Sequence, residues 1–301
     1  MITDADWAEL LYTRATDPDA VRRAYANRVR RERLLDRRGT LFLVAADHPA
    51  RGALGIGDRP TAMANRRELL GRLLVALADP DVDGVLATPD VIEELLLVNG
   101  LHNKVVIGSM NRGGLAGAEW EIDDRFTAFD VESIVDGGLD GGKMLLRLVD
   151  SDAGTVPTLE SCARAVSALA RRGLMAMVEP LPYRRDPAGQ LVPDPDPVAL
   201  ARAVTVASGL GATSAHTWLK LPAPADPSVL DATTLPVLVL GGPPSGKVAD
   251  DMAAWAGALA HPVVRGLVVG RTLLYPSHGD VAAAVEAAGR VLWTTASGPP
   301  S

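Results

Sequence analysis

Three charged residues stand inside runs of apolar residues, where an unpaired charge is costly. Lys143 lies in GKMLLRLV, Glu179 in MAMVEPLP and Lys220 in TWLKLP. Burial lowers the pKa of a lysine, and a neutral lysine attacks a carbonyl to form a Schiff base. Glu179 is suited to pair with a lysine and to move the protons that this reaction requires. The alternatives are lysines that reach the strand ends without chemistry and a purely structural ion pair.

Lysine is rare in this chain, and this rarity supports a chemical role for Lys143 and Lys220. The sequence has 30 lysines and arginines, and only four of these are lysines. Arg serves where a permanent positive charge suffices, whereas a buried Lys can become a neutral nucleophile. For the other two, Lys104 and Lys247, we predict no catalytic role.

Further polar residues follow the apolar runs, where a strand would end. Asp47 closes the run LFLVAAD, and His48 and Arg51 come directly after it. A carboxylate there binds a substrate hydroxyl or moves its proton, although it also caps turns. His48 and Arg51 are candidates for binding the substrate. Tyr183 follows the run that contains Glu179 and is a candidate proton donor.

Two glycine-containing loops predict a phosphate site. The first contains Gly241, Gly242 and Ser245, and the second contains Gly270 and Arg271. Backbone N–H groups of such loops bind phosphate, and an arginine adds a bidentate contact. A glycine pair is often only a turn, so the prediction rests on both loops together.

The elements that must position these residues alternate along the chain. Eight apolar runs read as buried parallel strands: 41–47, 84–89, 104–110, 142–149, 175–182, 217–222, 236–242 and 266–272. The helix candidates between them are 65–80, 90–100, 128–138, 158–173, 196–211, 247–260 and 279–293, with a weak one at 227–233. Eight such units predict a (β/α)8 TIM barrel, with a doubly wound sheet as the alternative. In a barrel, the active site lies at the carboxyl ends of the strands.

We predict three parts in the chain. Residues 1–38 form an N-terminal helical extension, 39–295 the barrel, and 296–301 a disordered tail. The basic stretch 21–38 favours a solvated helix or a subunit contact over a nucleic-acid arm, and we expect a homo-oligomer. The stretch 183–197 is rich in Pro, Gly and Asp and is predicted to be a loop over the site.

Composition and missing motifs exclude several classes. Of the 301 residues, 48% are hydrophobic, and the formal net charge of −7 argues against nucleic-acid binding. With no apolar run of about 18 residues and no signal-peptide pattern, we expect no membrane partner and a cytoplasmic protein. The single cysteine and the scattered histidines do not fit a metal site, and no nucleotide-binding motif is present. We therefore expect neither a metal nor an organic cofactor.

The ordered set of motifs resembles a known family. Asp-His after the first strand, GGKMLLRLVDSD, MVEPLPY, TWLKLPAP, VLVLGG and VVGRTL are similar to class I, Schiff-base aldolases. The group includes deoxyribose-phosphate, tagatose-bisphosphate and archaeal-type fructose-bisphosphate aldolases, and the resemblance covers about residues 40–290. One subset serves inositol catabolism and is expected to cleave 2-deoxy-5-keto-gluconate 6-phosphate.

The resemblance implies a lyase that acts on a phosphorylated keto-sugar, with roles for particular residues. Lys220 would form the Schiff base, and Lys143 would perturb that amine and position the substrate. Glu179 would dehydrate the carbinolamine, and Asp47 would contact the hydroxyl that loses its proton. Gly242 and Arg271 would hold a phosphate.

Two other classes of function fit the same residues. A phosphosugar isomerase or epimerase would use Glu179 as its base and Lys220 as an electrophile. A non-catalytic barrel would bind a sugar phosphate without turnover. Covalent trapping separates the aldolase from both.

Overall fold

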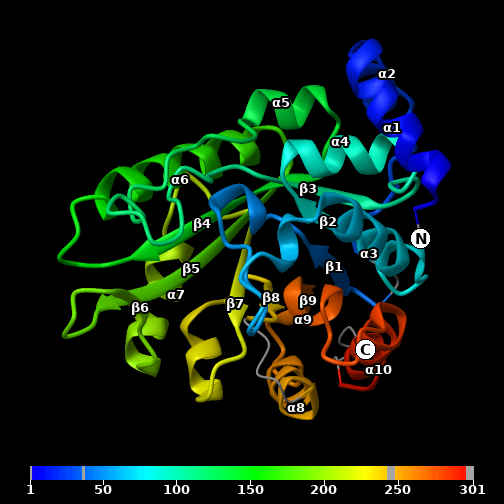
Figure 1. Ribbon diagram of the computed structural model, residues 1–301. Helices are drawn as coiled ribbons and strands as arrows, with labels where there is room; N and C mark the ends of the chain where they lie inside the picture. Colours follow the sequence, from blue (N-terminus) through cyan, green and yellow to red (C-terminus); the bar gives the residue numbers. More distant parts are fainter. Residues whose placement is uncertain (1, 36–37, 243–247, 296–301) are drawn as a thin grey trace.

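The computed structural model describes residues 2–35, 38–242 and 248–295. Within these residues, eight parallel strands close into a barrel surrounded by helices, as predicted (Figure 1). They are β1 (Leu41–Ala45), β2 (Gly84–Ala87), β3 (Val105–Ser109), β4 (Gly141–Leu148), β5 (Met175–Arg185), β7 (Thr217–Pro222), β8 (Val237–Leu240) and β9 (Val264–Val269). The pairing of β1 with β9 and of β4 with β5 closes the ring.

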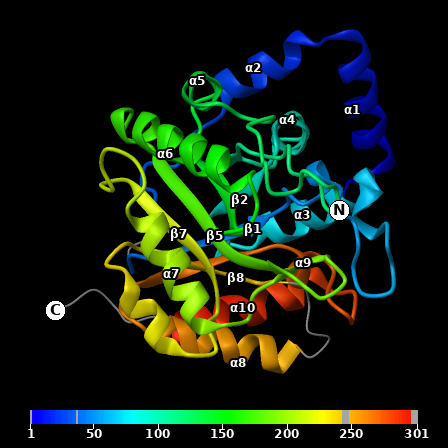
Figure 2. The same ribbon diagram turned by 90° about the vertical axis from the view of Figure 1, so that its left-hand side faces the viewer.

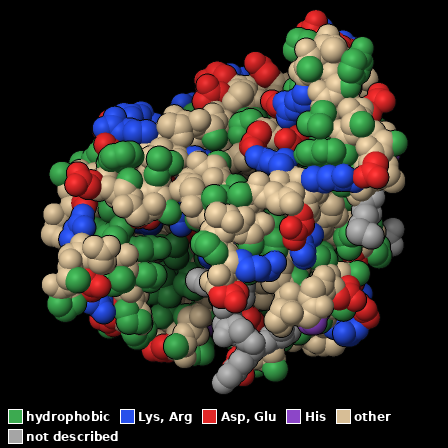
Figure 3. Space-filling view, in the orientation of Figure 1, with side chains coloured by type: hydrophobic (Ala, Val, Ile, Leu, Met, Phe, Trp, Pro, Cys, Tyr) green, Lys and Arg blue, Asp and Glu red, His purple; other side chains and the backbone are tan. Residues whose placement is uncertain are grey.

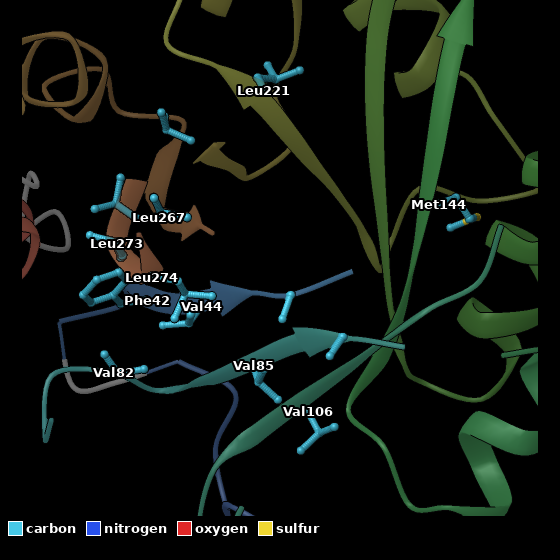
Figure 4. Close-up of a cluster of buried hydrophobic side chains, with 14 of the residues drawn as sticks. Phe42, Val44, Val82, Val85, Val106, Met144, Leu221, Leu267, Leu273 and Leu274 are labelled. Atoms are coloured by element: carbon cyan, nitrogen blue, oxygen red, sulfur yellow. The ribbon is translucent and has the colours of Figure 1, made fainter. Parts of the chain in front are cut away.

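The strands of the barrel are buried on both faces, which explains their continuous apolar runs. Side chains of Phe42 and Val44 in β1 pack in the layer between strands and helices, part of which Figure 4 shows. Leu41 and Leu43 alternate with them and join a second cluster of buried residues, made of strand residues, that fills the barrel interior. This period of two decides which residues of each strand point into the barrel.

The helices cover the outside of the barrel, and several begin with capping residues. Two further helices, α1 and α2, precede the barrel and are described below. The helices around the barrel are α3 (Arg66–Ala78), α4 (Pro89–Leu97), α5 (Val131–Asp136), α6 (Thr155–Arg171), α7 (Pro197–Ser208), α8 (Val248–Leu259), α9 (Arg271–Leu274) and α10 (Val281–Thr295). Asn65 accepts a hydrogen bond from the Glu68 N–H at the start of α3, and Asp196 caps α7 in the same way. The weak candidate at 227–233 is a 3₁₀ helix, Pro227–Ala232.

The stretch 183–197 differs from the predicted loop. Strand β5 continues to Arg185 and pairs with the antiparallel strand β6 (Leu191–Pro193). The Pro, Gly and Asp residues that predicted a loop form the turn of this hairpin and the start of α7. The hairpin therefore places Tyr183 at a defined position at the mouth of the barrel.

Two helices precede the barrel, α1 (Asp4–Thr16) and α2 (Asp19–Asn27), and lie at one edge of the molecule near α4 (Figures 1 and 2). Helix α2 ends at Asn27, so the helix expected over the basic stretch 21–38 is shorter than predicted. The chain then runs without helix beneath the barrel, where Leu34 and Leu35 pack against the interior cluster. This cluster includes the first residues of three strands, so the two leucines lie at the amino end of the barrel.

The described residues contain no helix that is long and apolar enough to cross a membrane. The predicted tail, 296–301, lies outside the described residues.

Candidate active site

Lys143, Glu179 and Lys220 all point into the barrel, each from a different strand. Glu179 stands two residues after Met177, a member of the interior cluster, and Lys220 stands two residues after Trp218, which packs against that cluster. Since side chains of a strand alternate between its faces, both enter the same interior. All three side chains are almost completely buried.

Glu179 lies between the two lysines. Its Oε1 is 3.1 Å from Lys220 Nζ, and its Oε2 pairs with Lys143 Nζ. Lys143 Nζ is also 3.1 Å from Asp47 Oδ2. The result is a buried chain of alternating charges from β7 to the end of β1: Lys220, Glu179, Lys143 and Asp47. We call these four residues the charged floor.

The neighbours of the charged floor set its protonation. Although burial by itself raises the pKa of Glu179, Lys143 and Lys220 lower this pKa to about 2. Burial lowers the pKa of Lys143 to about 8 against the opposing effect of Asp47 and Glu179. Burial also lowers the pKa of His48 to about 3, so this imidazole is neutral at pH 7. Both carboxylates are charged at rest.

Asp47 is held by Ser109, at the end of β3, and by Arg112, in the segment that follows β3. Ser109 Oγ at the end of β3 donates a hydrogen bond of 3.1 Å to Asp47 Oδ2, and Arg112 Nη1 lies 3.1 Å from the same oxygen. Burial raises the pKa of Asp47, but Lys143 and Arg112 outweigh it and hold the pKa well below its usual range. The other oxygen, Oδ1, has no hydrogen-bond partner among the residues described and is buried.

A cavity of about 350 Å³ opens above the charged floor at the carboxyl ends of the strands. Figure 3 shows the surface hollowed left of centre, over the place where Figure 1 draws β5, with largely hydrophobic walls. The sequence-predicted residues that line this cavity are Asp47, His48, Arg51, Lys143, Glu179, Tyr183, Lys220, Gly241, Gly242, Gly270 and Arg271. The remaining candidate, Ser245, lies outside the described residues.

The two glycine loops and Arg271 lie side by side in this cavity. Gly242 has a φ of +65°, which favours glycine, and a Cβ there would meet no atom within 4 Å. A Cβ on Gly270 would lie 2.5 Å from the carbonyl oxygen of Ala45, so the backbone there passes close to β1. Burial lowers the pKa of Arg271, and its Nε is buried without a hydrogen-bond partner among the described residues. This part of the cavity therefore combines open space above Gly242 with an arginine, Arg271, whose Nε lacks a hydrogen-bond partner among the described residues.

Tyr183 occupies the cavity wall above Glu179. Glu179, Leu181 and Tyr183 are alternate residues of β5, so their side chains stand in one column from the charged floor to the mouth. The phenol is half-buried, and this burial raises its pKa. Tyr183 is therefore protonated at neutral pH and able to donate a hydrogen bond.

Sequence reasoning missed two arginines of this site. Arg112 is 4% exposed and binds Asp47. Arg147 in β4 is 1% exposed, pairs with Glu121 and lies 3.3 Å from Asp124 Oδ2. Arg147 was detectable, because it interrupts an apolar run as Lys143 does. Arg112 follows a strand in an irregular segment, where no spacing marks it.

No group of three or more His, Cys, Asp or Glu side chains is arranged to hold a metal ion in the described part of the chain.

Comparisons with known proteins extend over nearly the whole chain. The model of the Cgl0159-like family matches residues 39–289. The crystal structure of Cgl0159 from Corynebacterium glutamicum is 49% identical, covers 98% of this chain and 99% of that one, and has a TM-score of 0.94. No curated protein matches the chain.

Two further solved structures share the barrel at much lower identity. One is described as an archaeal fructose 1,6-bisphosphate aldolase, with 20% identity, coverage of 87% and 96%, and a TM-score of 0.64. The other is described as a Schiff base forming fructose-1,6-bisphosphate aldolase, with 20% identity, coverage of 86% and 96%, and a TM-score of 0.67. At this identity, the likeness concerns the fold.

Proposed function

The chain belongs to the Cgl0159-like family, and for this member we propose a class I aldolase that cleaves or forms a C–C bond of a phosphorylated keto-sugar. The observation that carries the proposal is the position of Glu179 between two buried lysines. This arrangement gives one amine, Lys220, an acid–base partner 3.1 Å away at the floor of the cavity. An ion pair with a purely structural role would not require a carboxylate that is shared by two buried amines beside a cavity.

Lys220 is the nucleophile in this proposal. As its Nζ attacks the ketone carbon, Glu179 accepts the amine proton, because this carboxylate is ionised at rest. Glu179 passes this proton to the former carbonyl oxygen, which becomes the carbinolamine hydroxyl. A second proton from the nitrogen follows the same route, and the hydroxyl leaves as water. The iminium nitrogen serves as the electron sink when the C–C bond breaks.

Lys143 and Asp47 complete the sequence of proton transfers. Lys143 has a pKa of about 8 and contacts both carboxylates, so its ammonium group keeps one positive charge in the charged floor when Lys220 becomes neutral. Asp47 accepts the proton of the substrate hydroxyl next to the bond that breaks. Tyr183, which is protonated at neutral pH, is a proton donor within reach of the cavity, and the neutral His48 is able to bind the substrate by a hydrogen bond.

The phosphate of the substrate binds to Gly241, Gly242, Gly270 and Arg271. Their backbone N–H groups and guanidinium supply the donors that a phosphate requires. His48 and Arg51 also line the cavity, and Arg51 pairs with Glu121 at 3.2 Å. The ketone next to the phosphate then lies over Lys220, which stands on β7 beside these loops.

Two lines support this assignment beyond the geometry. The motifs around Lys143, Glu179 and Lys220 resemble those of Schiff-base aldolases. Two solved structures with this fold are described as fructose-bisphosphate aldolases. The sequence resemblance adds 2-deoxy-5-keto-gluconate 6-phosphate of inositol catabolism to the substrates worth testing.

Borohydride trapping tests the proposal. The protein is incubated with dihydroxyacetone phosphate, with fructose 1,6-bisphosphate or with 2-deoxy-5-keto-gluconate 6-phosphate, and is then reduced. We expect a stable mass increase in the intact protein, which is absent in Lys220→Arg. Lys104→Arg is the matched control and retains the adduct, because Lys104 binds backbone carbonyls away from the cavity.

The other outcomes assign the other functions. Proton exchange from the substrate without an adduct would favour an isomerase or epimerase. Saturable binding with neither adduct nor exchange would favour a non-catalytic sugar-phosphate barrel. Either result would overturn the aldolase proposal.

A further inference from the structure

Asp47 uses its two carboxylate oxygens unequally. Its Oδ2 lies 3.1 Å from each of three donor atoms, which belong to Ser109, Arg112 and Lys143. Its Oδ1 is buried and has no hydrogen-bond partner among the described residues. His48 Nδ1 lies 3.7 Å from Oδ1, which is beyond hydrogen-bond distance. Because Asp47 lines the cavity, Oδ1 is the oxygen that can accept a hydrogen bond from a bound molecule.

Arg112 has a matching gap among its donors. Its Nε donates 2.5 Å to the carbonyl oxygen of Asn111, and its Nη1 lies 3.1 Å from Asp47 Oδ2 and 3.3 Å from the Asp47 carbonyl oxygen. Its Nη2 is buried and has no partner within the part of the chain that the structure describes. A buried charged donor without an acceptor is costly. Since Arg112 also lines the cavity, an oxygen atom of a bound molecule would satisfy Nη2.

The segment that carries Arg112 is fixed to a neighbouring strand. Asn111 Nδ2 donates 2.6 Å to the carbonyl oxygen of Leu145 in β4, and the Leu145 N–H donates 2.7 Å to Asn111 Oδ1. Asn111 is completely buried. The two occupied nitrogens of Arg112 then fix the plane of its guanidinium. A donor that is held in place before the substrate arrives stabilises developing charge without reorganisation.

The other arginines that line the cavity have different surroundings. Arg51 pairs with Glu121 at 3.2 Å, and Arg271 follows directly after Gly270 in one of the two glycine loops. Arg112 is the arginine that forms an ion pair with Asp47 among the residues described. Arg271 is therefore placed to bind the phosphate, whereas Arg112 is placed beside the base that acts on the reacting hydroxyl.

We propose that Arg112 is a further catalytic residue, whose Nη2 binds the hydroxyl oxygen on the carbon of the bond that breaks, while Asp47 Oδ1 takes the proton of that hydroxyl. This inference rests on the proposed aldolase function and adds the group that binds the reacting oxygen. A hydroxyl both donates and accepts hydrogen bonds. It therefore suits the free acceptor and the free donor of this one ion pair.

The step that Arg112 assists is the cleavage of the C–C bond. The hydroxyl proton moves to Asp47 Oδ1, and the electron pair of the O–H bond forms the aldehyde C=O. The electron pair of the C–C bond moves to the iminium on Lys220, which becomes an enamine. Negative charge develops on the oxygen as the proton leaves, and Nη2 stabilises it by a charge-assisted hydrogen bond. In the synthetic direction, Nη2 polarises the aldehyde C=O before the new bond forms.

Measuring cleavage separately from Schiff-base formation tests the proposal. Fructose 1,6-bisphosphate and 2-deoxy-5-keto-gluconate 6-phosphate are supplied in turn, and kcat is measured from the release of dihydroxyacetone phosphate. Borohydride trapping with dihydroxyacetone phosphate reports Schiff-base formation alone, because this ketone lacks the hydroxyl that Arg112 would bind. Arg112→Met is expected to slow cleavage about 100-fold and to form this adduct at a rate within about threefold of the wild type. With a keto-sugar, the trapped adduct in Arg112→Met should have the mass of the intact sugar.

Two further variants separate contact with the substrate from support of Asp47. Arg112→Lys keeps a positive charge beside Asp47, but its single nitrogen cannot also hold the substrate oxygen, so cleavage should stay within about threefold of the rate in Arg112→Met. This variant also serves if Arg112→Met does not fold. Ser109→Ala removes a different donor to Asp47 Oδ2 and leaves Nη2 in place, so it should slow cleavage less than about tenfold.

Arg125→Met is the matched control. The Arg125 side chain is 66% exposed and does not line the cavity, so this variant should cleave at the wild-type rate. Wild-type cleavage by Arg112→Met, recovery of cleavage in Arg112→Lys, or an equal loss in Ser109→Ala would overturn the inference. Each of these results would leave the aldolase proposal intact.

The remaining outcomes distinguish this inference from the proposed function. Loss of the dihydroxyacetone phosphate adduct in Arg112→Met would place Arg112 in Schiff-base formation and overturn its assignment to the reacting hydroxyl. Wild-type adducts that never lead to cleavage would also overturn this assignment, because Asp47 and Arg112 would then not act on that hydroxyl. Absence of any adduct in the wild type would overturn both proposals.

Discussion

Lys220 Nζ and Glu179 Oε1 lie 3.1 Å apart, although the two residues come from different strands and are 41 positions apart in the sequence. The opposite oxygen of Glu179 is occupied by Lys143. A single carboxylate therefore serves two buried amines, and removal of a proton from one leaves the pairing of the other in place. This is the arrangement on which the proposed chemistry depends.

Glu179→Gln is expected to slow Schiff-base formation about 100-fold, because the amide cannot accept the proton of Lys220. The measurement is the rate of borohydride-trappable adduct formed with dihydroxyacetone phosphate. Glu119→Gln, at an exposed position, is the control and keeps the wild-type rate. An unchanged rate in Glu179→Gln would remove Glu179 from the reaction.

Acid is expected to destabilise the fold through Glu179. The pKa of Glu179 is about 2 in the folded protein, against an ordinary value of 4.5, so its stabilising contribution is present above pH 4.5. The contribution is lost as pH falls from 4.5 toward 2, because the unfolded chain binds the proton first. Urea unfolding across this range should show a shallower loss of stability in Glu179→Gln than in the wild type. Equal slopes in both proteins would contradict this assignment.

Arg147→Met is expected to lower the free energy of unfolding by about 3 kcal/mol, because Glu121 and Asp124 lose their buried cation. Hydrogen exchange of residues 114–124 should rise, since Arg147 also binds the carbonyl of Gly114. Arg125→Met removes an arginine that is 66% exposed and should cost no more than about 0.5 kcal/mol. Equal costs for the two variants would show that the Arg147 network does not hold this segment.

The segment beneath the barrel is expected to stabilise the fold. Arg28 has 2% of its side chain exposed, donates 3.0 Å to the carbonyl of Lys104 and lies 3.7 Å from Asp140. Arg28→Met should therefore cost about 2 kcal/mol in chemical unfolding, because these acceptors lose a charged donor. Arg22→Met is the control. The side chain of Arg22 is 75% exposed and pairs with Asp19, so its loss should change the free energy of unfolding little. The reverse order would mean that the segment contributes nothing.

Homo-oligomerisation stays a prediction, and light scattering of the full chain tests it. A shortened chain that begins near residue 38 is a poor comparison, because it also lacks Leu34 and Leu35 beneath the barrel interior. Substitution of an exposed α1 residue such as Tyr12 by Asp is a better comparison with the full chain, because it leaves Leu34 and Leu35 in place.

The barrel could be predicted from the sequence because strands buried on both faces read as uninterrupted apolar runs. Lys143, Glu179 and Lys220 could be identified for the same reason, because a charged residue inside an apolar run must have a partner. The hairpin after β5 could not be predicted in this way. Its turn residues read as a loop, and its pairing depends on Leu191 meeting Arg185 in space.

The rest of the site depends on three-dimensional proximity. Arg112 reaches Asp47 from a loop 65 residues away, and no periodicity in the sequence marks such a contact. Arg147 stands in an apolar run, but only the structure shows that Glu121 and Asp124 neutralise it.

The central claim is that Lys220 forms the covalent bond, and peptide mapping of the trapped adduct tests it most directly. The wild-type protein is reduced with borohydride in the presence of dihydroxyacetone phosphate, digested and analysed by mass spectrometry, with Lys143→Arg in parallel. The account predicts the modification on the peptide that contains Lys220 in both proteins. A modification on Lys143, or none on either lysine, would contradict it.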